Sequence, residues 1–249
     1  MKSNWSLFYK FAGDMPHEFY EVRQIGTSVW TATGEVEKMG ESTSTSFNIV
    51  DAAKVAYAKK CYQIKSEGFL LTREATYDAS HIDFDQLTNE IREGARKAFD
   101  KIRTAHPDQK INSLCLFSDE SAMTIAHCAN SKEALIAAGG DEDLVWNAAE
   151  WSFNEGGEFL DVAYRMILPF HLDGYCKMEF AEFRDAVFEA CVSALEQLDK
   201  EKFFGSGKDR EDVVLLFEVS DSDEVESTVK RLNTTKAFSR YKKWASSWQ

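Results

Sequence analysis

The sequence predicts an α+β protein made of two parts: a small antiparallel sheet with one helix, then a larger region whose central sheet is flanked by several helices. Aromatic and β-branched runs fill the first ~75 residues, whereas apolar residues recur at helical spacing after residue 83. Charge changes at the same place: residues 1–78 hold 9 Lys/Arg against 10 Asp/Glu, and residues 79–249 hold 20 against 32. We therefore expect domains at residues 1–75 and 80–249.

The first part is typical of strands separated by glycine turns. Gly26, Gly34 and Gly40 mark the turns. A helix is expected next, because apolar residues from Ala53 to Ile64 recur every three or four positions and Gly68 follows as a stop. The predicted strands are residues 5–11, 19–25, 28–33, 42–47 and 69–72, with the helix at residues 50–66.

After a polar connection at residues 73–82, the second part begins with a helix. Asp83 is its expected N-cap, and the helix ends before Pro107. We expect residues 213–219 to form a buried central strand, because they are an almost continuous apolar run. Residues 111–117 and 123–127 predict a strand pair, and helices are expected at residues 131–138, 144–168 (in pieces), 180–198 and 224–248.

Composition and charge exclude several classes of protein. The chain has a net charge of −13, and residues 79–249 account for −12 of it (20 Lys/Arg against 32 Asp/Glu). A phosphate backbone is bound chiefly by clustered cations, so we expect no nucleic acid at the second part. No apolar run is long enough to span a bilayer and the first residues lack a signal core, so we expect a cytoplasmic protein without membrane contact. Five scattered cysteines without a C-x-x-C pair predict no disulfide framework.

The chain shows none of the common catalytic motifs, and we expect neither a catalytic residue nor a cofactor. Gly205-Ser206-Gly207-Lys208 fails as a phosphate loop because the required earlier glycine and following Ser or Thr are absent. Asp221 and Asp223, after the expected central strand, predict a magnesium site in one interpretation. In the other, they belong to a solvated loop that protects a sheet edge.

A stretch that mixes tryptophans, carboxylates and glycines is the candidate contact patch. Trp146 and Trp151 would anchor a partner, ringed by Glu150, Glu155 and Glu158. The alternative is that these aromatic rings complete the hydrophobic core.

Residues 5–72 resemble a WGR domain, a small sheet-and-helix module named for a Trp-Gly-Arg signature. The resemblance is carried by residues 19–22, by Val29-Trp30 leading to Gly34, by Gly40, and by residues 42–47, 52–53 and 65–69. In eukaryotic poly(ADP-ribose) polymerases this module contacts DNA and neighbouring domains. Here the signature Trp and Arg fall on Thr33 and Glu35, so stacking and phosphate pairing are both lost. The resemblance therefore implies the fold without nucleic-acid binding.

Residues 83–241 resemble an uncharacterised bacterial domain, the domain of unknown function family 4303. The matching stretches are residues 84–87 through 105–107, 149–151, 209–216 and 229–233, together with Asp221 and Asp223. Such families occur among bacterial toxin–immunity and conflict systems. The resemblance implies a bacterial immunity or defence-accessory protein.

The leading hypothesis is a non-enzymatic protein whose acidic second part binds a basic protein partner, such as an effector. The alternatives are a nucleic-acid-linked regulator acting through the WGR-like part and a magnesium-dependent enzyme using Asp221 and Asp223. The sequence leaves the oligomeric state open.

Overall fold

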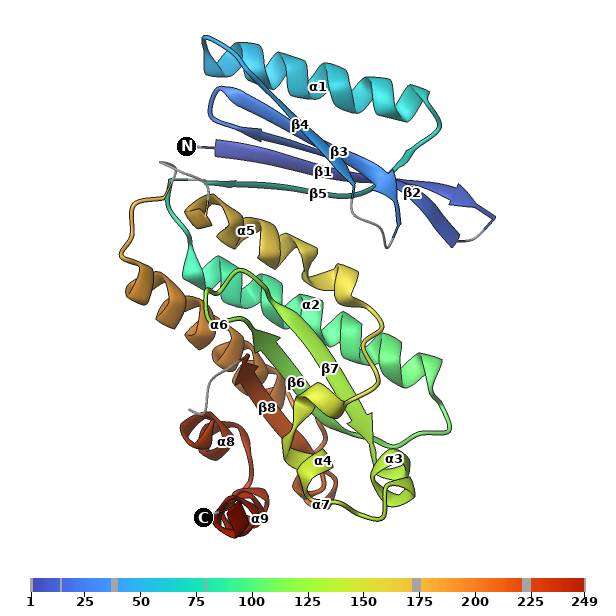
Figure 1. The fold of residues 1–249 in the computed structure, drawn as a ribbon, viewed down its shortest axis with the longest axis vertical. Helices are drawn as coiled ribbons and strands as arrows, with labels where there is room; N and C mark the ends of the chain where they lie inside the picture. Colours follow the sequence, from blue (N-terminus) through green and yellow to red (C-terminus); the bar gives the residue numbers. More distant parts are fainter. Residues whose placement is uncertain are drawn as a thin grey trace. The chain divides into compact units, whose positions relative to one another are not determined.

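The structure, a computed structural model, describes residues 2–13, 15–36, 40–78, 80–171, 176–220 and 225–248. The chain forms two compact units. Unit 1 comprises Met1–Ile82 with Leu172–Lys177, and unit 2 comprises Asp83–His171 with Met178–Gln249. Unit 1 holds a five-stranded sheet and unit 2 a three-stranded sheet with most of the helices (Figure 1). The predicted α+β class is confirmed.

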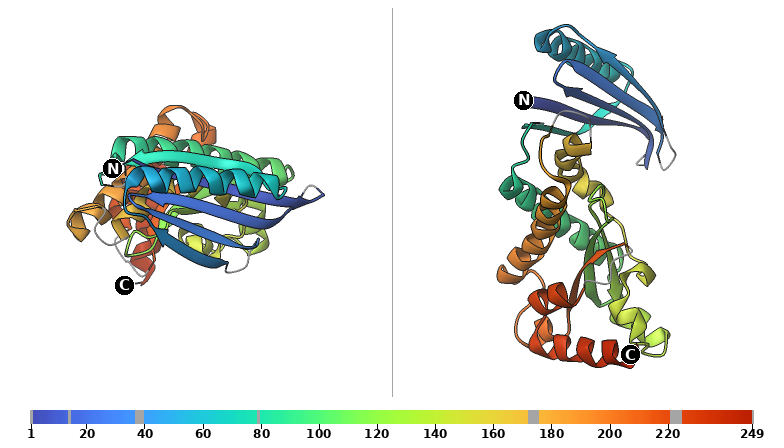
Figure 2. Two further views of the ribbon diagram at one scale, coloured as in Figure 1. Left: turned by 90° about the horizontal axis from the view of Figure 1, so that it is seen from above. Right: turned by 60° about the vertical axis from the view of Figure 1, so that its left-hand side comes forward.

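Unit 1 is an antiparallel sheet covered on one face by a helix. The strand order is β4-β3-β2-β1-β5. Figures 1 and 2 show α1 lying across one face of this sheet, where it buries an apolar cluster. The elements are β1 (Lys2–Ala12), β2 (Met15–Ile25), β3 (Ser28–Glu35), β4 (Glu41–Ser46), α1 (Val50–Ser66) and β5 (Leu70–Asp78). The cluster comprises Phe8, Val22, Val29, Ala53, Ile64 and Phe69.

The prediction that residues 73–82 form a connection is wrong for its first half, because β5 continues to Asp78. Its backbone pairs with β1 as far as Lys2 opposite Asp78. β5 is an edge strand, and Thr72, Glu74 and Thr76, which share one of its faces, are all exposed. This polar alternation resembles a loop in sequence although the strand is regular.

Gly34, which falls on the glycine of the WGR signature in the predicted resemblance, is required by packing. A Cβ at Gly34 would lie 2.9 Å from the Cα of Gly40 and 3.2 Å from the Phe19 ring. A Cβ at Gly40 would lie 2.5 Å from the same ring. The two glycines therefore accommodate Phe19 where β3 and β4 approach each other, which is a structural reason for Gly34 that needs no ligand.

Unit 2 is built on the sheet order β7-β6-β8, with β6 (Ile111–Ser118) in the middle, β7 (Ala126–Ser131) antiparallel to it and β8 (Val214–Val219) parallel to it. β8 was expected to be a central strand and is an edge strand. Its apolar sequence is explained by burial on both faces. Asn233 covers part of its open edge: its side chain accepts from the Leu215 N–H at 2.9 Å and donates to the Leu215 carbonyl at 2.6 Å.

β7 begins three residues later than predicted, because Asp119 organises a longer turn after β6. Its carboxylate accepts the backbone N–H of Ser121 at 2.9 Å and of Met123 at 3.1 Å. It also accepts the Thr124 hydroxyl at 2.7 Å. This turn takes residues 123–125 out of the strand.

One face of the three-stranded sheet, here the closed face, carries Leu114, Leu116 and Leu215 and lies under two long helices. α2 (Phe84–Ala105) and α6 (Phe180–Lys200) cover it. The Asp83 carboxylate caps α2 by accepting the Gln86 N–H at 3.0 Å, as the sequence predicts. All three leucines are fully buried.

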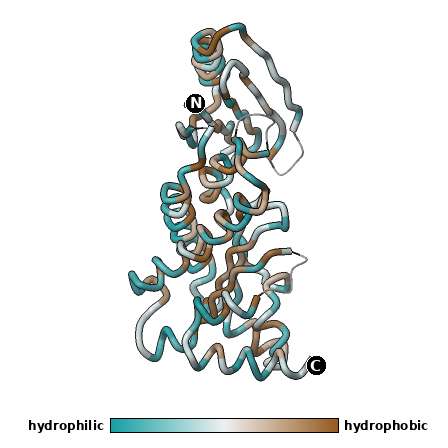
Figure 3. The backbone as a smooth tube through the Cα atoms, turned by 90° about the vertical axis from the view of Figure 1, so that its left-hand side faces the viewer, coloured by the Kyte–Doolittle hydropathy of each residue, from teal (hydrophilic) through white to brown (hydrophobic). Residues whose placement is uncertain are grey.

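The opposite face, here the open face, carries Cys115, Phe117, Leu216 and Glu218, since side chains alternate along a strand. Short elements and the C-terminal helices cover it. Figure 3 shows hydrophobic residues concentrated along the strands of this sheet. The remaining elements are α3 (Lys132–Ala137), α4 (Asp143–Trp146), η1 (Ala148–Glu150), η2 (Gly157–Leu160), α5 (Asp161–His171), α7 (Lys208–Glu211), α8 (Glu226–Leu232), α9 (Thr235–Ala245) and η3 (Ser246–Trp248).

Candidate binding site

Residues 143–160, here the 143–160 segment, cross the open face and pass around the edge of β7. Phe153 and Ala129 exchange two backbone hydrogen bonds, of 2.7 and 3.2 Å, and so close that edge. Beyond it the segment reaches α2, where a Cβ on Gly94 would lie 2.5 Å from the Phe159 carbonyl oxygen. Gly94 thus allows the segment to approach the helix closely.

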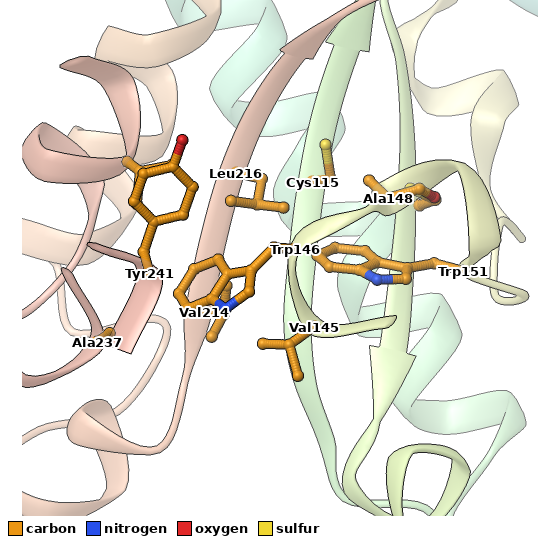
Figure 4. Packing of buried hydrophobic residues seen from close by; sticks show 11 residues of the cluster. Cys115, Val145, Trp146, Ala148, Trp151, Val214, Leu216, Ala237 and Tyr241 are labelled. Atoms are coloured by element: carbon orange, nitrogen blue, oxygen red, sulfur yellow. The ribbon is translucent and has the colours of Figure 1, made fainter. Parts of the chain in front are cut away.

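Trp146 and Trp151 lie in the core, which agrees with the alternative interpretation of the contact patch. They are 4% and 6% exposed. The Trp151 indole donates to the Leu144 carbonyl at 2.8 Å, and the Trp146 ring meets Tyr241 edge-on at 5.3 Å. Figure 4 shows both indoles over the sheet, Trp146 beside Val214 and Trp151 beside Ala148. Only the edges of these rings remain for a ligand.

The three predicted carboxylates occupy different environments. Glu150 is exposed and makes no ion pair with the described residues. Glu155 lies 2.6 Å from Nε2 of His106, and Glu158 lies 2.9 Å from Nζ of Lys101. Burial acts to raise the pKa of Glu155, but hydrogen bonds from His106 and the backbone outweigh it and leave the pKa below its usual value. Glu155 and Glu158 thus hold the segment to α2, and Glu150 alone faces solvent freely.

His127 lies on the closed face, and its contacts are those of a residue that holds the fold together. Its ring meets Phe99 of α2 at 5.7 Å, and Nε2 lies 3.0 Å from the Glu155 carbonyl oxygen. Burial lowers the pKa of His127, although the carbonyl contact opposes the shift. The imidazole is therefore favoured in its neutral form.

Two neighbouring pockets open on the other side of the sheet, and both are lined by Glu218 and Val219. The first has a volume of about 520 Å³ and lies among β6, β7, β8 and the 143–160 segment. The second, of about 340 Å³, lies between α4, β8 and α9. The first is lined by Phe117, Ala126, His127, Cys128, Ala148, Ala149, Trp151, Asn154, Gly157, Glu218, Val219 and Ser220.

Glu218 is the functional candidate that sequence analysis missed. It lies opposite Phe117 in the register of β6 and β8, so its side chain belongs to the open face. Its carboxylate accepts the Ala148 N–H at 3.3 Å and makes no ion pair within the described part of the chain. Burial raises its pKa, and the Ala148 hydrogen bond only partly opposes that rise. A half-buried carboxyl without a cation beside it is the least compensated charge of this site.

Cys115 and Cys128 lie opposite each other on β6 and β7, in the row next to that of Phe117 and Ala126. Both are free, buried thiols. The Cys128 thiol donates to the Ala148 carbonyl at 3.4 Å, and burial raises the pKa of Cys115 well above its usual value. Buried thiols held in this way act as small packing groups.

The predicted magnesium ligands Asp221 and Asp223 lie outside the described residues. Within the described ranges, no three His, Cys, Asp or Glu side chains gather as metal ligands would. The same ranges contain no helix of the length and apolar character needed to cross a membrane.

Comparison with known proteins identifies one family. The model of the family described as Domain of unknown function (DUF4303) matches residues 91–234, more than half of the chain. No curated protein matches. A crystal structure of a Bacteroides fragilis protein is similar at 22% identity and a TM-score of 0.25, over 29% of this chain. The chain spans about a fifth of that protein, 20% of its length. The WGR-like resemblance of residues 5–72 stays a prediction.

Proposed function

The chain belongs to the DUF4303 family, and we propose that it is a non-enzymatic protein whose acidic unit 2 binds a basic protein partner. One observation carries the proposal. Residues 141–158 contain six carboxylates and no Lys or Arg, and this stretch borders the two pockets that share Glu218. Its exposed carboxylates, Asp141 and Glu150, attract cationic proteins and repel nucleic acid.

The exposed carboxylates contribute mainly through long-range attraction. Asp141 and Glu150 are both exposed, whereas Glu142 is engaged by Arg240 at 2.8 Å. Because exposed charges are screened beyond about 10 Å at 0.1 M salt, association through this surface is salt-sensitive. The two pockets that share Glu218 supply the short-range part, since they are concave features beside these charges.

The test is capture of a protein partner from the native host by the full chain, at low and at high salt. We expect a basic protein that is retained at low salt and released at high salt. The double variant Asp141→Asn/Glu150→Gln should retain less of it. The charge-matched control Asp108→Asn/Glu182→Gln changes two exposed carboxylates outside the acidic stretch and should retain as much as the wild type. Equal retention by both variants, or no partner at either salt concentration, contradicts the proposal.

The cellular role that goes with this proposal is bacterial immunity or defence. It rests on the resemblance to families found in toxin–immunity systems and on the acidic surface, which would cap a basic effector. A toxin gene immediately upstream in the genome would support it. Genes of unrelated metabolism in that position across bacteria would count against it.

A second function, as a nucleic-acid-linked regulator, is favoured by one feature of unit 1. Lys54, Lys59 and Lys65 are exposed on α1, together with Tyr62, which is 76% exposed. Cations beside an aromatic ring suit a single-stranded nucleic acid. An electrophoretic shift of the full chain, abolished by Lys59→Gln/Lys65→Gln, would support this function. The absence of any shift at low salt would exclude it.

A further inference from the structure

We propose that the pocket floored by Phe117 and Glu218 receives an arginine side chain of the partner, with the guanidinium against the Glu218 carboxylate. This inference rests on the proposed function and names the group that the partner brings. The group that the pocket would recognise is a planar cation, the guanidinium, carried on an aliphatic stem.

The floor of the pocket is set by strand register. Ala126, Phe117 and Glu218 lie side by side in one row across β7, β6 and β8. Their side chains point to the same face because paired residues share a face. Cys128, in the next row, also lines the pocket. The floor therefore changes from apolar to acidic across the width of the sheet.

The walls come from the 143–160 segment. Trp151 is fixed by its hydrogen bond to the Leu144 carbonyl at 2.8 Å, and its neighbours Ala148 and Ala149 also border the pocket. Asn154 adds an amide at the rim. An aliphatic stem fits between such apolar walls, and a guanidinium gives up its water more readily than an ammonium does.

Glu218 supplies the charge that the pocket would recognise. It has one backbone donor, the Ala148 N–H, and no cation beside it among the described residues. The charge of a buried carboxylate is generally compensated by a cation. In this pocket the ligand would supply the cation that compensates the charge of Glu218. A planar guanidinium can donate two parallel hydrogen bonds to it.

The volume is compatible with this occupant. The pocket measures about 520 Å³, within the roughly 300–1,000 Å³ of ligand sites. It is open to solvent at the rim, where Asn154 and Ser220 lie and where Ser220 is exposed. A side chain of a bound protein can therefore enter while its backbone stays outside.

The test is a titration of the full chain with N-acetyl-arginine amide, followed by the Trp151 indole N–H in a ¹H–¹⁵N spectrum. Trp151→Phe assigns the signal. We expect a saturable shift with this probe and none with N-acetyl-citrulline amide, which has the same shape without the charge. Equal shifts with both probes, or no shift with either at matched salt, overturn the inference.

Glu218→Gln is the decisive variant, because the amide oxygen can still accept the Ala148 N–H while the charge is lost. We expect binding of the arginine probe to weaken by about tenfold or more. The control is Asp108→Asn, which removes the same charge from an exposed residue just before β6 begins, at the end of the strand opposite to Phe117. This variant should bind the arginine probe like the wild type. Unchanged binding by Glu218→Gln overturns the inference.

The two proposals fail in distinguishable ways. If Glu218→Gln captures the protein partner as well as the wild type, the pocket inference fails and the proposed function stands. If the arginine probe binds through Glu218 but no protein partner is captured, the pocket stands as a site for a small cation and the proposed function fails.

Discussion

The two faces of the three-stranded sheet in unit 2 have the same strands and opposite characters. The closed face lies under two long helices, α2 and α6, which bury Leu114, Leu116 and Leu215 completely. The open face lies under the 143–160 segment and the shorter C-terminal helices α8 and α9, and two pockets remain there. Long helices with regular apolar faces fill the space above a sheet, whereas short irregular elements leave gaps. A pocket of about 750 Å³ also lies between α6 and the end of β8, so the closed face is filled at Leu114, Leu116 and Leu215 rather than over its whole length. The difference indicates that these three leucines provide stability and that the open face is available for binding.

The largest expected effect on stability comes from shortening Leu215 and Leu216. They are neighbours on β8, both fully buried, and they point to opposite faces. We expect Leu215→Ala to lower the free energy of unfolding by about 4 kcal/mol and Leu216→Ala by about 2–3 kcal/mol, because the looser cover of the open face can relax into the cavity. Urea denaturation measures both. Equal losses would contradict the distinction between the faces.

Glu218→Gln tests the open face, where we expect loss of a charge to stabilise the fold rather than weaken it. Its pKa is raised in the folded chain, so the folded state holds the proton more tightly than the unfolded chain. The ionised group therefore costs stability at neutral pH, and this cost disappears as the pH falls below the unfolded value of about 4.5. We expect the variant to gain on the order of 1 kcal/mol at pH 7 and almost nothing at pH 4. A loss of stability at pH 7 would contradict the account.

His127 tests the closed face in the opposite pH range. Its pKa is lowered by burial, so its contribution to stability is complete above the unfolded value of 6.5 and is lost as the pH falls through the folded value. We expect His127→Gln to lose stability at pH 7 through the missing contact with Phe99, and to show a weaker decline between pH 7 and pH 5. Thermal unfolding at the two pH values measures it. An unchanged decline would place the acid sensitivity elsewhere.

Glu150→Gln should have the smallest effect on the fold. Its side chain is exposed, so the free energy of unfolding should change by less than about 0.5 kcal/mol. Association with a basic partner should weaken at low salt and match the wild type at high salt. Equilibrium binding at two salt concentrations checks this. A salt-independent loss would mean that Glu150 makes a direct, desolvated contact.

Much of the fold follows from local patterns in the sequence. The Asp83 cap, the helix after it and the first four strands of unit 1 were all predicted, because each depends on neighbouring residues. Position within a sheet could not be predicted in this way. Residues 213–219 have the composition of a central strand, and only the packing of Asn233 against Leu215 shows how such a strand can stand at an edge.

Sequence patterns pointed to a stretch that lies beside the candidate pockets and missed Glu218, which lies outside that stretch. The stretch from Trp146 to Glu158 does border both pockets, yet its tryptophans are core residues and two of its carboxylates hold α2. Glu218 gave no signal, because a carboxylate on a strand is usually a solvent-facing residue. What buries it is the 143–160 segment, which is distant in sequence and lies over the open face only after folding.

The most direct test of the account is a pH titration of the Glu218 carboxyl by ¹³C NMR, with and without N-acetyl-arginine amide. Alone, the carboxyl should titrate above its usual value, as its burial requires. With the arginine probe bound, its pKa should fall, because a cation beside the carboxylate favours the charged form. A pKa that is the same with and without the probe would show that no cation reaches Glu218 and would contradict the central claim.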